Sequence, residues 1–131
     1  MFVVQRHHAT NIHFDLRLEV DGVLASWAVP KGPSADPRQK RLAVRVDDHE
    51  LEHASYENDV EGRGSVVIWD SGTFENLTER DGEPVSVADA LAAGHLKVVL
   101  HGDRLQGAYT LQQTRMGGDD RNWLLVKVTD P

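Results

Sequence analysis

Hydrophobic and polar positions alternate strictly over residues 12–19 of the chain. The apolar members of this pattern are Ile12, Phe14, Leu16 and Leu18. The polar members are His13, Asp15, Arg17 and Glu19. Because successive side chains of a strand point to opposite faces, the pattern predicts a strand with one apolar face and one face of polar, chemically versatile side chains. Asp21-Gly22 then predicts a tight hairpin turn into a partner strand over residues 23–29.

Short apolar runs separated by turn residues continue along the chain. An apolar run covers residues 2–4, and further strands are predicted over residues 41–46, 65–69, 73–77, 96–100, 104–114 and 121–128. Turns are predicted at 47–53 and 70–72, and only residues 86–94 have the cap, first-turn acid and terminal glycine of a helix. About eight short, mostly antiparallel strands with one or two peripheral helices indicate an all-β barrel or sandwich.

Length and composition indicate one globular domain over residues 1–131. Hydrophobic residues make up 40% and charged residues 27% of the chain, which contains no cysteine. A disulfide scaffold and a cysteine-ligated metal are therefore excluded. No run approaches the ~18 apolar residues of a membrane span, and the first residues lack the apolar core of a signal peptide. We therefore expect no membrane partner and a cytoplasmic location.

The formal net charge of -7 is unevenly distributed. Residues 1–45 hold seven Lys and Arg against four acids, whereas the rest of the chain holds seven against seventeen. A basic segment on an otherwise acidic protein suits local binding of an anionic end. It does not suit coating of a long duplex, which needs an extended basic face.

The polar face of the strand at 12–19 carries a possible metal site. His13 and Asp15 lie two residues apart on that face, roughly 6 to 7 Å along the strand. His7 would add a third ligand if the chain turns back at residues 9–11. Two imidazoles and a carboxylate suit a divalent transition metal with open positions, and Arg17 would stand beside it as a phosphate-binding cation. A plain solvated strand face is the alternative, although such faces normally carry Thr, Lys, Glu and Ser.

Several motifs together resemble the 3'-phosphoesterase domain of bacterial DNA ligase D. They are Val4-Gln5-Arg6-His7, the run His13 to Glu19, Asp21-Gly22, the run Ser26 to Pro33, Arg41 to Val44, Asp48-His49, the run Val67 to Gly72 and the run Trp123 to Lys127. The resemblance covers essentially the whole chain. It implies a compact β-barrel, closed or partly closed, with helices on its outside.

The resemblance also implies roles for individual residues. His7, His13 and Asp15 would bind manganese, although their chemistry alone also admits zinc, cobalt or iron(II). Arg17 and His49 would serve the phosphate, with His49 as a hydrogen-bond donor or general acid. Gln5 would orient a metal ligand or a phosphate oxygen, and weaker substrate contacts would come from Lys31 and Arg41. His53 stands where the family usually has a tyrosine, and it would donate a hydrogen bond near the phosphate.

The expected function is metal-dependent healing of 3' ends. The phosphodiesterase activity removes a 3'-terminal ribonucleoside, and the phosphomonoesterase activity removes a 3'-phosphate to leave a 3'-hydroxyl. Expected partners are DNA or mixed RNA/DNA 3' ends at a primer-template and the ligase and polymerase components of bacterial end joining, met by a monomer. One alternative is an iron(II)-dependent oxygenase that uses the same triad. Another is a catalytically weak module that binds nucleic-acid 3' ends, which His53 and a short loop after residue 57 would allow.

Overall fold

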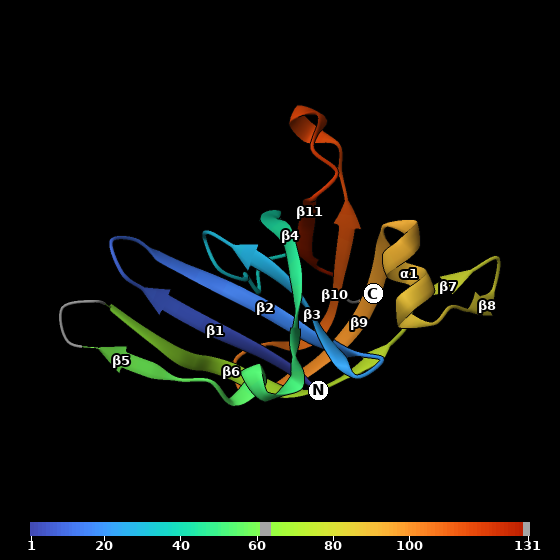
Figure 1. Cartoon of the computed structure of the whole chain (residues 1–131). Helices are drawn as coiled ribbons and strands as arrows, with labels where there is room; N and C mark the ends of the chain where they lie inside the picture. The colour runs from blue at the N-terminus through green and yellow to red at the C-terminus, as the bar shows by residue number, and fades with distance from the viewer. Residues whose placement is uncertain (61–63, 130–131) are drawn as a thin grey trace.

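Eight antiparallel strands close into a barrel in the computed structural model of the chain, which describes residues 1–60 and 64–129 (Figure 1). Their order around the barrel is β1-β2-β3-β4-β11-β10-β9-β6, and β6 pairs back onto β1. The all-β barrel expected from the sequence is confirmed, and it is closed. The barrel strands are β1 (Phe2–His8), β2 (Ile12–Val20), β3 (Val23–Val29), β4 (Arg41–Glu50), β6 (Gly64–Asn76), β9 (His95–Gly102), β10 (Gln106–Gln113) and β11 (Asn122–Lys127).

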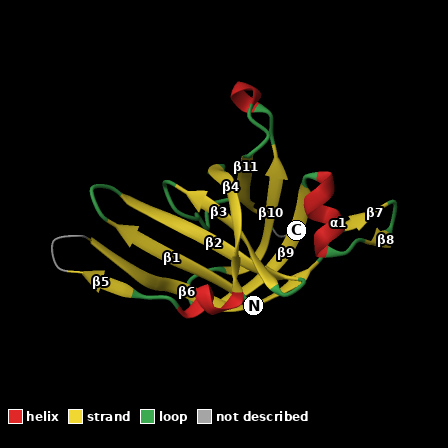
Figure 2. Cartoon of the chain, in the orientation of Figure 1, coloured by secondary structure: helices red, strands yellow, loops and turns green. Residues whose placement is uncertain are grey.

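The remaining elements are short and peripheral (Figure 2). They are the strands β5 (Asn58–Val60), β7 (Glu79–Arg80) and β8 (Glu83–Pro84), the helix α1 (Val87–Ala93), and the 3-10 turns η1 (Leu51–Ser55) and η2 (Met116–Gly118). Residues 61–63, part of the loop after residue 57 that the sequence suggests is short, lie outside the described part of the chain. Among the described helices, none is long and apolar enough to cross a membrane.

The predicted hairpin between β2 and β3 is confirmed. Asp21 and Gly22 both have positive φ values, 50° and 87°, as a tight two-residue hairpin turn requires. This turn sets the register that pairs Leu16 with Trp27. Both side chains are buried in the barrel interior, where Trp27 meets Trp123 edge to face at 5.8 Å. The alternation along residues 12–19 therefore directs one face of β2 into the core.

The predicted helix is also confirmed. Ser86 caps its first turn by accepting a hydrogen bond from the Asp89 backbone at 3.1 Å, and Gly94 ends it in the left-handed region. The helix buries Ala90 in the barrel core and contacts β9. It lies near one end of the barrel (Figure 1).

The turn predicted at residues 70–72 is wrong, because β6 runs through it without a break. The Asp70 carboxylate is buried and accepts backbone hydrogen bonds at 2.8–3.2 Å from residues 103–105 and from Ser71. Gly72 is needed for a close approach of strands, since a Cβ there would collide with the His101 carbonyl oxygen of β9. The residues that looked like a turn instead anchor one strand to another.

The polar turn predicted at 47–53 is wrong in its first half. β4 continues to Glu50, and only then does the chain enter η1. The longer strand pairs with β3, where His49 lies opposite Leu24 next to a β-bulge. As a result, η1 follows directly from β4 and lies against the outer face of the barrel beside β3.

Candidate functional site

The polar residues of β1 and β2 form one patch on the outer face of the barrel. In the antiparallel register Gln5 lies opposite Asp15, and His7 lies opposite His13. Residues directly opposite each other share a face of the sheet, so all four project to the same side. Arg17, two residues beyond Asp15, extends the patch on the side away from the core.

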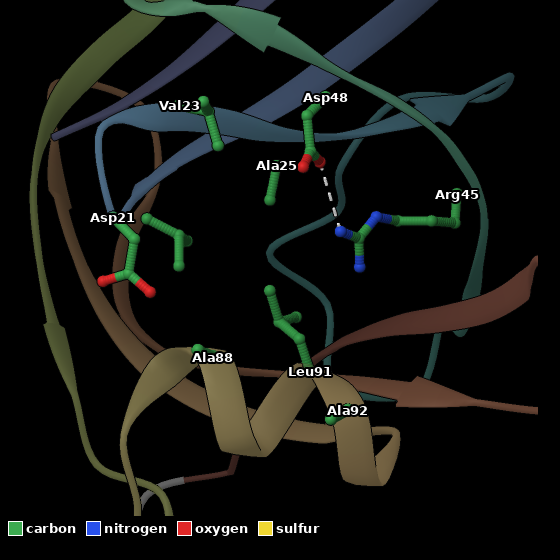
Figure 3. Close-up of a pocket in the computed structure, with 9 residues that line it drawn as sticks. Asp21, Val23, Ala25, Arg45, Asp48, Ala88, Leu91 and Ala92 are labelled. Carbon is green, nitrogen blue, oxygen red and sulfur yellow. Dashed lines mark hydrogen bonds and ion pairs between the residues drawn. The ribbon is translucent and has the colours of Figure 1, made fainter.

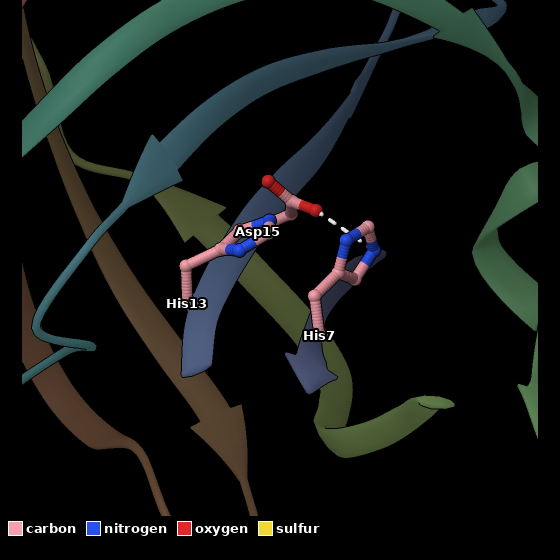
Figure 4. Close-up of side chains that lie close together, drawn as sticks. All are labelled: His7, His13 and Asp15. Atoms are coloured by element: carbon pink, nitrogen blue, oxygen red, sulfur yellow. Dashed lines mark ion pairs between the residues drawn. The ribbon is translucent and has the colours of Figure 1, made fainter. Parts of the chain in front are cut away.

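The structure brings the three predicted metal ligands together. One potential donor atom from each of His7, His13 and Asp15 lies within 4.8 Å of the others. The Nε2 atom of His7 is 3.1 Å from the Asp15 Oδ2 atom, and the two imidazole rings are 4.6 Å apart in an edge-on arrangement. Figure 4 shows His13 and Asp15 on β2 converging with His7 on the neighbouring strand. The turn at residues 9–11 that this convergence needs is present as the β1–β2 hairpin.

The donor set fits a divalent transition metal. His7 Nε2 is buried and makes no hydrogen bond of acceptable angle, despite its 3.1 Å approach to the Asp15 carboxylate. The His7 nitrogen and the Asp15 oxygen are therefore close together but not aligned for a hydrogen bond. Both atoms can instead donate electron pairs to one cation that lies between them. Burial lowers the pKa of His7. The neighbouring His13 and the cation of Arg17 also lower this pKa, whereas the Asp15 carboxylate raises it. A lowered pKa favours the neutral form of His7 that a metal ligand requires.

Arg17 is a buried cation that organises the patch. Only 3% of its surface is exposed. Its Nε donates to the Gln5 side-chain oxygen at 2.8 Å, its Nη1 donates to the Ser26 hydroxyl at 2.8 Å, and its Nη2 lies 3.6 Å from the Asp15 carboxylate. Burial lowers the pKa of Arg17 and Asp15 raises it, but a guanidinium stays charged in proteins. Arg17 therefore places a fixed positive charge beside the Asp15 carboxylate.

Sequence reasoning missed Ser26, which completes the setting of Arg17. Ser26 is fully buried on β3, directly opposite Arg17 in the register. Its hydroxyl accepts from the guanidinium and donates to the Leu24 carbonyl oxygen at 3.0 Å. The sequence does contain a sign of this role, because Ser26 is the one polar residue in the apolar run 23–29, and the Asp21-Gly22 hairpin places it opposite Arg17.

Gln5 joins the barrel to the segment that covers the patch. Its side-chain nitrogen donates to the carbonyl oxygens of His53 at 2.7 Å and of Tyr56 at 3.1 Å, and the residue has no exposed surface. The η1 segment thereby covers part of the outer face. This cover explains why Val3 and Leu24, which share that face, are fully buried although they are not part of the barrel core.

His49 and His53 lie next to each other beside the patch, with ring centroids 4.5 Å apart. Burial lowers the pKa of His53, and the nearby Arg17 and His49 lower it further, whereas Glu50 and Asp15 raise it. His53 is thus within electrostatic range of both Arg17 and Asp15. The structure brings the two histidines to the site although they lie over thirty residues from the metal ligands in the sequence.

The two remaining candidates lie apart from this network. Lys31 is exposed in the loop after β3, and the Arg41 Nη2 atom donates to the Gln39 side chain at 3.0 Å. In residues 1–60 and 64–129, neither forms a hydrogen bond or ion pair with the metal ligands or Arg17. Their substrate contacts stay predictions.

Two hollows of the surface are relevant to the choice of site. A cleft of about 350 Å³ borders His7 and His13 and is also lined by His8, Asn58 and Ser65. A larger hollow of about 410 Å³ lies between α1 and the β2–β3 hairpin, where Leu91 and Ala25 point into it and Arg45 pairs with Asp48 at 3.3 Å (Figure 3). Among the described residues, only His7, His13 and Asp15 form a group of three potential metal ligands. The cleft beside His7 and His13 is therefore the candidate functional site, although it is the smaller of the two hollows.

A family model for the DNA ligase D 3'-phosphoesterase domain matches residues 5–113. The chain belongs to this family. The matched span includes every candidate residue of the site, from Gln5 to His53. His53, where the resemblance led us to expect a tyrosine, also lies within the matched span.

Relatives of this phosphoesterase domain are large proteins of bacterial end joining. A multifunctional non-homologous end joining protein LigD of Pseudomonas aeruginosa is 43% identical over 98% of the chain. LigD of Mycolicibacterium smegmatis is 41% identical over 98%, and the LigD DNA repair protein of Mycobacterium tuberculosis is 43% identical over 94%. The chain spans only 15–17% of the length of these relatives.

Proposed function

We propose that this domain is a metal-dependent phosphoesterase that heals DNA 3' ends during non-homologous end joining. It removes a 3'-terminal ribonucleoside, which leaves a 3'-phosphate, and it removes a 3'-phosphate to leave a 3'-hydroxyl. The observation that carries the proposal is the convergence of His7, His13 and Asp15 beside the buried Arg17, on residues that match the phosphoesterase family. The end-joining names of the relatives supply the biological setting.

His7, His13 and Asp15 would hold the metal, for which we propose manganese, with cobalt or zinc as substitutes. When bound, such an ion polarises phosphoryl oxygens and lowers the pKa of water. The fixed charge of Arg17, beside Asp15, stabilises negative charge that develops on the phosphate.

His49 and His53, beside the patch, would donate hydrogen bonds or a proton to the phosphate and its leaving group. His49 donates a hydrogen bond to a phosphate oxygen or acts as general acid to the leaving oxygen. His53, kept mostly neutral by its lowered pKa, donates from its ring N–H in the role that the family gives to tyrosine. Gln5 holds the backbone of residues 53 and 56 in place, and with it the position of His53.

The substrate we propose is the 3' end of DNA or of a mixed RNA/DNA strand at a primer-template. A cluster of a few cationic and metal-binding groups suits one terminal phosphate, whereas duplex binding would need an extended basic surface. Ligase and polymerase components of end joining would use the 3'-hydroxyl that the reaction leaves. We propose that the domain works as a monomer on these ends.

A labelled primer-template with a single 3' ribonucleotide tests the proposal. Incubated with Mn²⁺, the wild type should release the ribonucleoside and then the remaining 3'-phosphate. His13→Ala should lose activity together with bound metal, whereas Arg17→Ala and Arg17→Lys should lose activity and still bind metal. The matched control is His95→Ala, which removes an exposed histidine on β9. Metal content is measured by equilibrium dialysis, and folding is checked by circular dichroism.

Two outcomes would overturn the proposal. Oxygen uptake with iron(II) and no phosphoester cleavage would favour the oxygenase that uses the same triad. Tight binding of 3' ends without turnover, across manganese, cobalt and zinc, would favour a binding module. Membership of the phosphoesterase family favours the hydrolase over both.

A further inference from the structure

Three aromatic rings form a column at the edge of the site. The rings of His49 and His53 are 4.5 Å apart, and the next ring, Tyr56, lies 5.1 Å from His53 with an angle of only 10° between the two planes. His49 is at the end that belongs to β4, and Tyr56 is at the far end, just after η1. The column therefore leads from the histidines of the proposed phosphate site to a tyrosine.

Tyr56 is exposed but held in place. Its residue is 42% exposed, although its ring stacks on His53. Its carbonyl oxygen accepts from Gln5, its backbone N–H donates to the His53 carbonyl oxygen at 3.1 Å, and its hydroxyl accepts from the Asn58 side chain at 3.2 Å. A large aromatic ring that packs into no core, yet is fixed at three points, is prepared to contact something outside the chain.

The position of Tyr56 relative to the metal ligands suits a nucleotide. Gln5, which binds the Tyr56 backbone, lies directly opposite Asp15 in the β1–β2 register. Asn58, which binds the Tyr56 hydroxyl, lines the same cleft as His7 and His13. Tyr56 is thus connected by single hydrogen bonds to both the ligand patch and the cleft beside it.

We propose that Tyr56 is a stacking platform for a nucleobase of the substrate. The base is that of the nucleotide whose 3' oxygen carries the attacked phosphate. This inference rests on the function proposed above and adds the group that recognises the nucleoside. Every base has a π-face, so stacking on Tyr56 gives affinity for the end of a strand without selecting a sequence. The phosphate then enters the metal site with its nucleoside already held.

The test uses oligonucleotides with a 3'-phosphate, because the attacked phosphate is then bonded to only one nucleoside. A phosphodiester would join two nucleosides, and either base could stack. One substrate carries a normal terminal base, and a matched substrate carries an abasic terminal nucleotide. With the normal substrate, Tyr56→Ala should reduce kcat/KM by roughly 5- to 150-fold, mostly through KM, which is the usual effect of removing one stacked base contact. Tyr56→Phe should stay within about twofold of wild type, because the ring is retained.

The abasic substrate separates stacking from a structural role. Wild type and Tyr56→Ala should cleave it at equal rates, since neither has a base to hold. An equal loss on both substrates would overturn the proposal, because it would mean that Tyr56 acts by holding His53 in place. A large loss for Tyr56→Phe would also overturn it, because it would assign the hydroxyl a direct role.

A binding measurement keeps the test independent of catalysis. 2-Aminopurine at the terminal position should lose fluorescence on binding the wild type and Tyr56→Phe but not Tyr56→Ala. Quenching that is unchanged in Tyr56→Ala would refute stacking even if cleavage is normal. If the wild type quenches the probe and cleaves no substrate with any metal, the proposed function fails while the stacking platform remains.

Discussion

Replacement of Gln5 by leucine tests whether the η1 segment is fastened to the barrel through one side chain. Leucine has a similar volume but no polar atoms in its side chain, so the change removes hydrogen bonds and leaves no large cavity. Gln5 makes three of them, one from Arg17 Nε and two to the carbonyl oxygens of His53 and Tyr56.

The expected loss follows from which partners are left without a bond. The His53 carbonyl oxygen still accepts from the Tyr56 backbone, so it is not abandoned. The Arg17 Nε–H and the Tyr56 carbonyl oxygen do lose their only partners among the described hydrogen bonds. Each buried unsatisfied group costs about 1–3 kcal/mol, and the Tyr56 carbonyl can regain water near the surface. The free energy of unfolding should therefore fall by about 2–4 kcal/mol.

Urea unfolding followed by circular dichroism measures this loss. The matched control is Gln112→Leu, which replaces an exposed glutamine on β10 and should stay within about 0.5 kcal/mol of wild type. Amide hydrogen exchange should also accelerate at Tyr56 before the barrel strands exchange. A Gln5→Leu variant as stable as the control, with unchanged exchange at residues 51–56, would refute the role of Gln5 as the fastening point.

Four further outcomes are expected. Mn²⁺ should raise the melting temperature of the wild type but not of His13→Ala in differential scanning fluorimetry, because a ligand of the native state stabilises it; equal shifts would place the metal elsewhere. Since the pKa of His53 is lowered from 6.5, the unfolded chain takes up a proton before the native state does, so stability should fall as the pH drops below about 6.5. His53→Gln should reduce this slope in urea titrations at about pH 7 and about pH 5.5, and an unchanged slope would contradict the argument. Asp70→Asn should lower the free energy of unfolding by about 2–4 kcal/mol in the same assay, because backbone N–H groups lose an acceptor; a loss below about 0.5 kcal/mol would contradict it. Gly72→Ala should abolish the cooperative melt, and a normal melt would show that β6 and β9 can separate.

The parts of the site that follow local periodicity were predictable from the sequence. His13 and Asp15 are separated by one strand period, and His7 needed only a hairpin that the intervening polar residues favour. The parts that depend on distant strands were not. That Ser26 supports Arg17, or that Gln5 meets the backbone of Tyr56, depends on registers that no single segment displays.

The errors in the predicted elements have the same origin. Residues 70–72 have the composition of a turn, but Asp70 finds its backbone partners more than thirty residues away. Residues 47–50 are polar on their own, yet pairing with β3 keeps them extended. Local composition predicts the conformation that a segment prefers on its own. Pairing with neighbouring strands of the barrel can override that preference.

The three proposed metal ligands all lie on a single hairpin, within nine consecutive positions of the chain. Hairpins form in microseconds, well before a barrel with such distant pairings can assemble. We therefore expect a chain that has formed only this hairpin to bind a cation before the barrel closes, which would reduce the stabilisation measured at equilibrium. Manganese should therefore speed refolding by more than its stabilisation of the native state, measured as the shift in melting temperature, would account for.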